Sequence, residues 1–275
     1  MSSPVLQALI AALEVRAAVA FVTVVAASGD AGALLGRHML VWQGDVRAPL
    51  SDFDTDPQLE HRIVDAAESA LRVGNHATVA FATDAGALTC FIEVQTPPAH
   101  LIICGAGHIA VPLAQIAHLC DFEVSVIDDR AQYASQARFP SADRVIAGDF
   151  RTELAALRAG HARFDARTCA VLVTRGHQHD VECLVELLDD PLPYIGMIGS
   201  RRRVRAVFDL LQSVHNLPRA RFSNIYAPVG LDIGAHTPAE IAVAIMGELI
   251  NVLRGGPAIS LRDNLHRTPK REEPS

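Results

Sequence analysis

Short apolar runs alternate with amphipathic segments from residue 101 to about residue 253. The apolar runs predict strands at 101–104, 123–127, 144–147, 168–173, 193–198 and 223–227. Apolar positions at helical spacing between them predict helices at 108–120, 131–137, 151–159, 179–189, 201–215 and 238–253. Such alternation is typical of α/β proteins in which helices cover both faces of a parallel sheet. Six strands suit the doubly wound, Rossmann-like order.

The first hundred residues show a pattern typical of a small α/β domain. Helical periodicity covers 4–17 and 57–73, and β-branched or alternating runs predict strands at 20–26, 38–42, 77–82 and 87–94. The last two strands form an expected hairpin around Asp84-Ala85-Gly86. Residues 28–32 predict a turn and residues 47–56 a loop. The three aspartates of that loop are more typical of a solvated loop than of a cation site.

Pro97 and Pro98 mark the expected domain boundary, because paired prolines break secondary structure and stiffen a linker. We therefore expect a small α/β domain at 1–98, a Rossmann-like domain at 99–256 and a mobile, polar C-terminal tail at 257–275. The start of the last helix is predicted by the capping box Thr237-Pro238-Ala239-Glu240, and its end by Gly255-Gly256.

The first strand of the Rossmann-like region leads directly into a glycine turn, Gly105-Ala106-Gly107-His108-Ile109-Ala110. Gly105 permits a tight turn, and the missing Cβ of Gly107 lets a phosphate approach the free N–H groups of the following helix. Asp128 ends the next strand about 20 residues on, the offset of an acid that accepts a ribose hydroxyl. The pattern predicts a nucleotide-type phosphate site; a glycine turn that only lets helix and strand pack closely is the alternative.

Polar residues gather where the predicted strands end. Because ligands of such folds bind outside the carboxyl ends of the strands, residues in these loops are candidate cofactor-binding positions. The candidates are Gly105, Gly107, His108, Asp128, Asp129, Arg130, Arg175, His177, His179, Asp180, Gly199, Ser200, Arg201, Gly230 and Asp232. Their convergence on one rim favours a ligand site. No Ser-His-Asp set or paired carboxylates suggest a catalytic centre.

Two of these loops allow more than one interpretation. The run Arg201-Arg202-Arg203 begins a helix, where cations oppose the macrodipole; a bound anion would offset them, unless all three point into solvent. The stretch His177-Gln178-His179-Asp180 could ligate a metal. Asp180 is nevertheless well placed to cap the following helix, so capping or ligand hydrogen bonding is the expected role.

Composition narrows the class of protein. A net charge of −7 and a pI of about 5.9 favour neither nucleic acid nor an anionic membrane as partner. The five cysteines form no C-x-x-C pair, which argues against a zinc knuckle or a disulfide framework. No apolar run approaches the ~20 residues of a membrane span, and the N-terminus lacks a basic region typical of a signal peptide. We therefore expect a cytoplasmic protein.

In order and spacing, the loops of residues 100–250 resemble the XdhC/CoxI family, the accessory proteins that mature xanthine dehydrogenase-type molybdenum enzymes. The matching stretches are Gly105-Ala106-Gly107-His108, Asp128-Asp129-Arg130, Arg138-Phe139-Pro140-Ser141-Ala142-Asp143, Thr174-Arg175-Gly176-His177-Gln178-His179-Asp180, Tyr194-Ile195-Gly196-Met197-Ile198-Gly199-Ser200-Arg201, Ala227-Pro228-Val229-Gly230-Leu231-Asp232-Ile233-Gly234 and Thr237-Pro238-Ala239-Glu240-Ile241-Ala242. As a set they are highly specific.

The resemblance implies a cofactor and partners. Members of the family are described as binding the molybdenum cofactor, either molybdopterin or its nucleotide form. They protect it while its terminal sulfur is installed, with a cysteine desulfurase as partner, and hand it to the apo-enzyme. The resemblance thus implies a chaperone-like maturation factor rather than an enzyme, docking on a molybdenum hydroxylase and plausibly forming a homodimer.

The first hundred residues depart from the family pattern. The family usually has Gly-Ser-x-Pro-Arg where this chain has Ser28-Gly29-Asp30-Ala31-Gly32, and Cys-Gly-Gly where it has Asp84-Ala85-Gly86. A glycine triplet expected after Gly44 is replaced by the aspartate-rich loop. Cys104 is a candidate substitute thiol, but a buried core thiol is the expected role. Two alternatives stay open: an NAD(P)-dependent oxidoreductase, supported by the glycine turn and Asp128, and a divergent paralogue with a binding or regulatory role.

Overall fold

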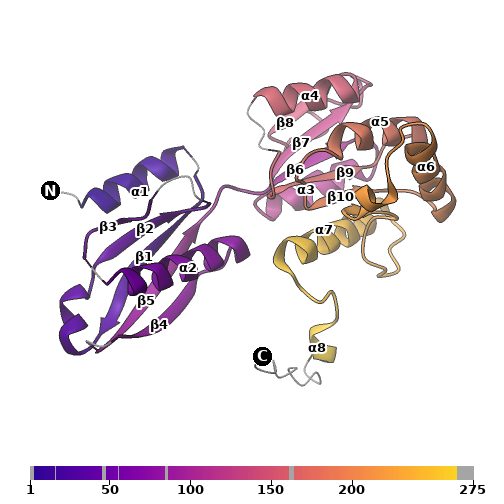
Figure 1. Cartoon of the computed structure of the whole chain (residues 1–275). Helices are drawn as coiled ribbons and strands as arrows, with labels where there is room; N and C mark the ends of the chain where they lie inside the picture. Colours follow the sequence, from indigo (N-terminus) through magenta and orange to yellow (C-terminus); the bar gives the residue numbers. More distant parts are fainter. Residues whose placement is uncertain are drawn as a thin grey trace. The chain divides into compact units, whose positions relative to one another are not determined.

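The computed structural model describes residues 3–15, 17–44, 48–54, 56–83, 86–160 and 164–264 (Figure 1). By its internal packing the chain divides into two compact units, Met1–Pro97 and Pro98–Ser275. Both units combine helices with a sheet, so the mixed α/β class is confirmed. None of the helices within the described ranges is long and apolar enough to cross a membrane.

The first unit is an antiparallel sheet with one helix on each face. Its elements are α1 (Pro4–Glu14), β1 (Val19–Ala27), the 3₁₀ helix η1 (Gly29–Leu34), β2 (His38–Trp42), β3 (Leu50–Ser51), α2 (Pro57–Val73), β4 (Ala77–Thr83) and β5 (Gly86–Gln95). The strand order is β3-β2-β1-β5-β4. Alternation along β1 explains the two layers: Ala20, Val22 and Val24 pack with α2, whereas Val19 and Phe21 pack with α1.

Two predictions for this unit need correction. Residues 28–32 were expected to be a turn, but Gly29–Leu34 forms a 3₁₀ helix. Leu50–Ser51, expected to be part of a loop, pairs with β2 as a short edge strand. Asp52 explains this pairing, because its carboxylate accepts a hydrogen bond from the His38 N–H at 2.8 Å. Asp84 and Ala85, the predicted hairpin turn, lie outside the described residues.

The second unit is a parallel sheet with helices on both faces. Its elements are β6 (His100–Cys104), α3 (Ala110–Leu119), β7 (Glu123–Asp128), β8 (Arg144–Ala147), α4 (Phe150–Gly160), β9 (Thr168–Leu172), α5 (His177–Leu187), β10 (Tyr194–Met197), α6 (Arg201–Ser213), the 3₁₀ helix η2 (Arg219–Phe222), β11 (Ile225–Tyr226), α7 (Pro238–Arg254) and α8 (Leu261–Asn264). The strand order, β11-β10-β9-β6-β7-β8, is the doubly wound order, so the Rossmann-like prediction is confirmed.

Neighbouring residues of β6 face opposite layers. Leu101 and Ile103 pack in one core with α3 and α7, and Ile102 and Cys104 pack in the other with α4, α5 and α6. All five residues of this strand are buried, as expected for a central strand covered on both sides. Strand order reverses between β6 and β9, so a crevice for a ligand is expected where these two strands end.

The predicted helix at 131–137 is wrong, because that stretch consists of turns. The side chain of Arg138 donates to the carbonyl oxygens of Tyr133 and Ala106, each at 2.9 Å. Tyr133 lies against the guanidinium of Arg130, whose Cζ is 3.9 Å from the ring centroid. Phe139 is buried in the core. These long-range contacts fix the backbone in turns, against its helical periodicity.

The C-terminal segment begins as its capping signals predict. In α7 the Thr237 side chain accepts from the Glu240 N–H, Glu240 accepts from the Thr237 N–H, and Gly255 closes the helix with φ +67°. The short helix α8 lies within the segment predicted to be a tail. Residues 265–275 of that predicted tail lie outside the described residues.

Candidate functional site

The glycine turn after β6 is built as the sequence requires. Gly105 has φ +109°, and a Cβ there would lie 2.6 Å from the carbonyl oxygen of Val173, at the end of β9. Only glycine fits this position. A Cβ on Gly107, by contrast, would meet no described atom within 4 Å. The protein's own packing therefore does not require glycine at 107, and the space beside it is open to a ligand.

Ala106, between the two glycines, is held on both sides of its backbone. Its N–H donates to Asp128 Oδ2 at 2.7 Å, and its carbonyl oxygen accepts from Arg138 Nη1 at 2.9 Å. The two partners come from the end of β7 and from the segment between β7 and β8. Arg138 was not a candidate site residue, although it lies in a stretch that resembles the family. The turn is therefore preorganised by side chains from distant parts of the chain.

The carboxylate of Asp128 is engaged by groups of the protein itself. Its side chain is buried, and Oδ1 accepts from the N–H and Nε of Arg130, while Oδ2 accepts from Ala106 N–H and Arg130 Nη2. All four acceptor sites of the carboxylate are thus used within the protein. Contact of Asp128 with a ribose hydroxyl stays a prediction, and it would have to compete with these hydrogen bonds. Arg130, which is also a predicted cofactor-binding residue, anchors Asp128 in the structure.

Opposing effects act on the pKa of Asp128. Burial alone would raise the pKa, but the hydrogen bonds from the Arg130 side chain and the backbone N–H groups of Ala106 and Arg130 outweigh it. The net pKa lies below the ordinary value of an aspartate, so the charged form is favoured.

The first turn of α3 lies beside the glycine turn. The helix begins at Ala110, two residues later than predicted, and its N-cap, Ile109, offers no side-chain acceptor to the first N–H groups. That turn also holds no acid within the described residues. The N–H groups of a helix's first turn have no intrahelical acceptor, so they are available to an anion. His108 is exposed in the same turn.

Arg175 and Asp129 meet above the crevice. Arg175 Nη1 and Nη2 donate to Asp129 Oδ1 and Oδ2 at 3.0 and 2.7 Å. The two residues follow β9 and β7, the strands on either side of β6. Their ion pair therefore joins the loops that flank the glycine turn. Both are candidate site residues, and the structure brings them together with Gly107 on one rim.

Asp180 was predicted to cap α5, and this prediction is wrong. The helix begins at His177 with Gly176 as its N-cap, so Asp180 lies within the first turns and is fully buried. Its carboxylate accepts from Thr174 Oγ1 at 2.6 Å and from Arg203 Nε at 2.8 Å. Burial raises the pKa of Asp180, although the hydrogen bonds from Thr174 and Arg203 act in the opposite direction.

His177 and His179 lie in different surroundings. His179 packs against Phe150 and lies 3.1 Å from Glu182 Oε2, whereas His177 faces a groove along α6. The structure therefore does not bring the two histidines and Asp180 together as ligands. No group of three or more His, Cys, Asp or Glu side chains able to hold a metal ion occurs within the ranges that the structure describes.

The three arginines at the start of α6 have different surroundings. Arg203 donates to Asp180 and to the carbonyl oxygen of Thr174, whereas Arg201 and Arg202 are exposed. Ser200 caps the helix by accepting from the Arg203 N–H, and Gly199 packs against the Arg203 side chain. Arg203, which was not a candidate, is therefore the arginine that ties this loop to the rim.

The loop after β11 is fixed by α7. Gly230 has φ +101° and donates its N–H to Glu248 Oε2 at 2.9 Å, the oxygen that also accepts from the Tyr194 hydroxyl at 2.7 Å. Asp232 is exposed on the same loop. Gly230 thus serves the packing of the loop, and its partner Glu248 was not among the candidate residues. Cys104, considered as a substitute thiol, is fully buried and offers no sulfur to the rim.

Residues from two divergent segments of the first unit, 28–32 and the aspartate-rich loop, lie around one pocket together with the end of β4. It has a volume of about 410 Å³ and is lined by Asp30 and Ala31, by Asp54 and Asp56, and by Ala82 and Thr83. Gly86, in the third divergent segment, packs closely against the first segment. Its φ is +137°, and a Cβ there would lie 2.0 Å from the carbonyl oxygen of Ser28. The charged residues of the lining are three aspartates and one cation, Arg62, and the remaining residues are neutral.

Comparisons with known proteins identify relatives of the second unit. The model of the XdhC Rossmann domain matches residues 101–249. A Bacillus subtilis (strain 168) protein, named as a probable subunit of xanthine dehydrogenase, is 38% identical over 160 residues, 58% of this chain and 44% of that protein. The Escherichia coli (strain K12) "Uncharacterized protein YqeB" is 31% identical over 173 residues, 62% of this chain and 30% of that protein.

A solved structure extends the likeness to both units. A crystal structure described as a xanthine dehydrogenase from Bacillus halodurans is 27% identical, with a TM-score of 0.65, and the match covers 91% of this chain and 66% of that chain. The chain spans less than half the length of the two curated relatives.

Proposed function

The chain belongs to the XdhC family, and on this premise we propose that it binds the molybdenum cofactor and delivers it to a xanthine dehydrogenase-type molybdenum hydroxylase. The family relation to xanthine dehydrogenase indicates an accessory role. Cofactor binding and delivery are the proposed steps beyond it. The proposal also includes a cysteine desulfurase as a second partner, the cytoplasm as the compartment and a homodimer as the assembly.

The observation that carries the proposal is the glycine turn. Gly105 is required by its contact with Val173, but Gly107 is not required by any neighbour in the described structure. The open space at Gly107 borders the first turn of α3, which has no side-chain cap in the described chain. These features fit the phosphate of a pterin cofactor, since a phosphate can accept from several backbone N–H groups at once.

Each neighbouring group has a distinct part in holding such a ligand. The N–H groups at the start of α3 bind the phosphate, Asp128 and Arg138 hold the turn in place, and Arg175 supplies a guanidinium at the margin. The bound cofactor supplies the molybdenum that the partner enzyme needs. The family role requires no chemical step by this chain, in keeping with a maturation factor.

The test is the identity of the ligand that copurifies with the protein. The chain is purified from a host that makes molybdenum cofactor, denatured and oxidised, and the extract is examined for the fluorescent pterin product and, by mass spectrometry, for nucleotides. We expect near-stoichiometric pterin in the wild type and at least tenfold less in Gly107→Asp. Gly160→Asp is the control, because Gly160 also has open space around it but ends α4.

Other outcomes favour other functions. NAD(P) without pterin would contradict the proposal and favour an oxidoreductase, although the acid expected to bind its ribose, Asp128, is engaged within the protein. Equal pterin in Gly107→Asp and Gly160→Asp would contradict the phosphate site.

The acidic pocket of the first unit favours a second candidate, a divergent paralogue with a binding or regulatory role. Asp30, Asp54 and Asp56 line this pocket, and such a lining opposes an anionic ligand. Association with the hydroxylase without retention of pterin would support this candidate over cofactor delivery.

A further inference from the structure

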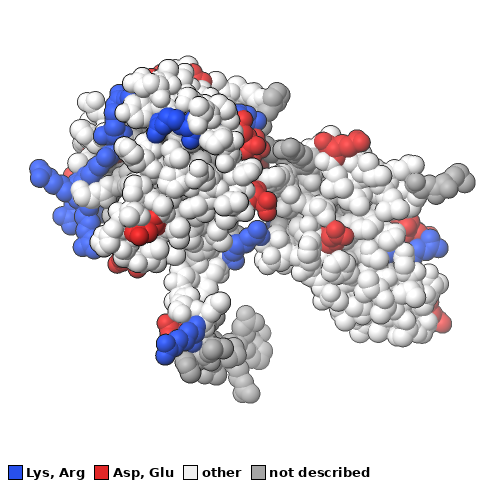
Figure 2. All heavy atoms as spheres, turned by 180° about the vertical axis from the view of Figure 1, so that it is seen from behind, with Lys and Arg blue, Asp and Glu red and all other residues white. Residues whose placement is uncertain are grey.

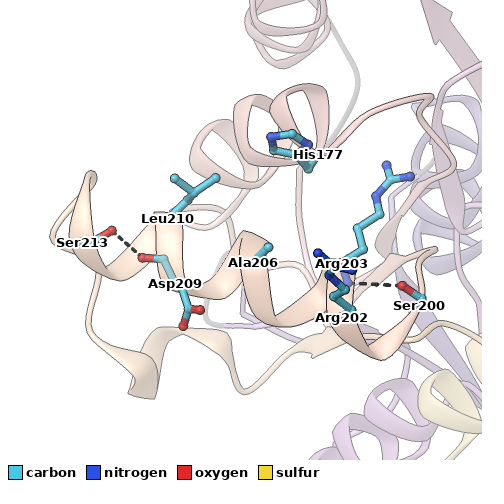
Figure 3. A pocket seen from close by; sticks show the side chains of 8 residues that line it. All are labelled: His177, Ser200, Arg202, Arg203, Ala206, Asp209, Leu210 and Ser213. Carbon is cyan, nitrogen blue, oxygen red and sulfur yellow. Dashed lines mark hydrogen bonds between the residues drawn. The ribbon is translucent and has the colours of Figure 1, made fainter.

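An open groove of about 570 Å³ runs along one side of α6, beside the start of α5 (Figure 3). One end is polar and is formed by His177, Ser200 and Arg202. Beyond it, Ala206 and Leu210 form an apolar stretch, and Asp209 and Ser213 line the far end. Arg202, Ala206 and Leu210 are four residues apart and so form one row along the helix, about 12 Å long at 1.5 Å per residue.

The surface around this groove is basic in a chain of net charge −7. Between residues 201 and 224 the only acid is Asp209, and the arginines are Arg201, Arg202, Arg203, Arg205, Arg219 and Arg221. Two of them have acidic partners: Arg203 pairs with Asp180 and Arg221 with Asp189. Figure 2 shows basic side chains, which are arginines in this part of the chain, gathered over the end of the second unit that α6 forms.

Exposed arginines remain available to a partner. Arg201, Arg202, Arg205 and Arg219 are exposed and form no ion pair with a described residue. Three of them lie in the first turns of α6, where positive charge opposes the helix dipole. Arginine forms bidentate hydrogen bonds with carboxylates and is enriched in protein interfaces. A basic rim beside an apolar floor therefore fits an acidic protein segment that carries an apolar side chain.

The groove lies on the same rim as the glycine turn. Ser200 follows β10, and β10 is separated from β6 only by β9. Two strand spacings correspond to about 10 Å. Arg203 links the two places, because it lines the groove and also donates to the carbonyl oxygen of Thr174, the residue after Val173. A protein seated on α6 would thus be next to a ligand held at Gly107.

We propose that this groove, with Arg202 in its lining and the exposed Arg205 on the next turn of α6, docks an acidic segment of the molybdenum hydroxylase during cofactor transfer. The inference rests on the proposed function, because that function supplies the partner. The net negative charge of the chain disfavours nucleic acid on this surface. The apolar floor fits a protein side chain better than it fits a free inorganic anion.

The experiment measures binding of the full chain to the cofactor-free hydroxylase purified from the same organism, at low and high NaCl. The test variant is R202E/R205E. Glutamate in the first turns of a helix is favourable, so the variant keeps α6 folded. The control is R72E/R151E, which makes the same charge change at two exposed arginines on α2 and α4. Copurified pterin is measured for every protein.

We expect wild-type binding to weaken with salt, R202E/R205E to bind at least tenfold more weakly, and R72E/R151E to bind within twofold of the wild type. All three should retain the same amount of pterin. Ala206→Trp, which fills the floor, should also weaken binding. Unchanged binding by R202E/R205E would overturn the docking site alone. Loss of pterin in R202E/R205E would overturn it by assigning the groove to the cofactor. Absence of both pterin and binding in the wild type would instead overturn the proposed function.

Discussion

Arg175 and Asp129 form a bidentate ion pair, at 3.0 and 2.7 Å, between the loops that flank the glycine turn. Nearly half of the Arg175 side chain is exposed, so solvent screens the pair and its net contribution is about 1 kcal/mol or less. A ligand phosphate can therefore compete with Asp129 for the guanidinium. The pair holds Arg175 near the site without binding it tightly.

Asp129→Asn should accordingly increase affinity for a phosphate-bearing ligand. Removing the carboxylate frees Arg175 and removes a negative charge that opposes the phosphate. We expect a three- to tenfold lower Kd for ADP, used as a soluble phosphate probe in calorimetric titration, with thermal stability nearly unchanged. Asp65→Asn, an exposed acid on α2, is the control for net charge. Weaker binding by Asp129→Asn would show that this carboxylate is itself a ligand contact.

Asp128 should contribute stability that depends on pH. Its folded-state pKa is below the ordinary value, so its contribution is fully present above about pH 4 and is lost as the pH falls through the folded-state pKa. Asp128→Asn should destabilise the second unit by about 2–4 kcal/mol at neutral pH, because Arg130 loses its buried partner. Urea unfolding from pH 6 to pH 2 should show a steeper acid loss for wild type than for Asp128→Asn. An equal loss of stability with acid in the wild type and in Asp128→Asn would contradict a lowered pKa of Asp128.

Sequence signals that involve neighbouring residues predicted the helices and strands well. The helix at 57–73 was predicted with its observed bounds, because Asp56 and Pro57 cap its start and Gly74, with φ +72°, closes its end. The glycine turn and the doubly wound order followed from apolar strands and from Gly105. These features depend on residues a few positions apart, whose geometry a sequence pattern encodes directly.

Roles that depend on distant partners could not be predicted in the same way. Asp128 resembles a ribose acceptor by its position, but the hydrogen bonds from Ala106 and Arg130 use its oxygens. Asp180 resembles a helix cap, but Arg203 lies 23 residues further along the chain. Which acid is exposed and which is buried depends on side-chain placement across loops, and a single sequence does not contain that information.

The buried pair Asp180–Arg203 should be the strongest coupling on the rim. Arg203→Ala leaves a fully buried carboxylate without its cation and should cost about 3–5 kcal/mol. Asp180→Asn should cost less, and the double variant should cost less than the sum, as a double-mutant cycle by urea unfolding would show. Arg205→Ala, an exposed neighbour, should change stability by about 0.5 kcal/mol or less. Additive costs would contradict direct coupling.

The same pair predicts a change in pH dependence. Burial already raises the pKa of Asp180, and loss of Arg203 removes an effect that lowers it. The folded state of Arg203→Ala then binds a proton more readily than the unfolded state. Its stability, relative to wild type, should recover as the pH is lowered from 7 towards about 4, the ordinary pKa of an aspartate. A stability difference independent of pH would show that Asp180 stays charged in the variant.

Two alanine substitutions separate what the glycine turn requires from what a ligand requires. Gly105→Ala places a Cβ 2.6 Å from the Val173 carbonyl oxygen at φ +109°, and should cost about 3 kcal/mol or more. Gly107→Ala meets no described atom within 4 Å, so its thermal unfolding should match the wild type. If a phosphate occupies that space, Gly107→Ala should nevertheless retain several-fold less pterin. A stable Gly107→Ala protein with full pterin would show that the ligand does not approach the backbone there, whatever site it uses.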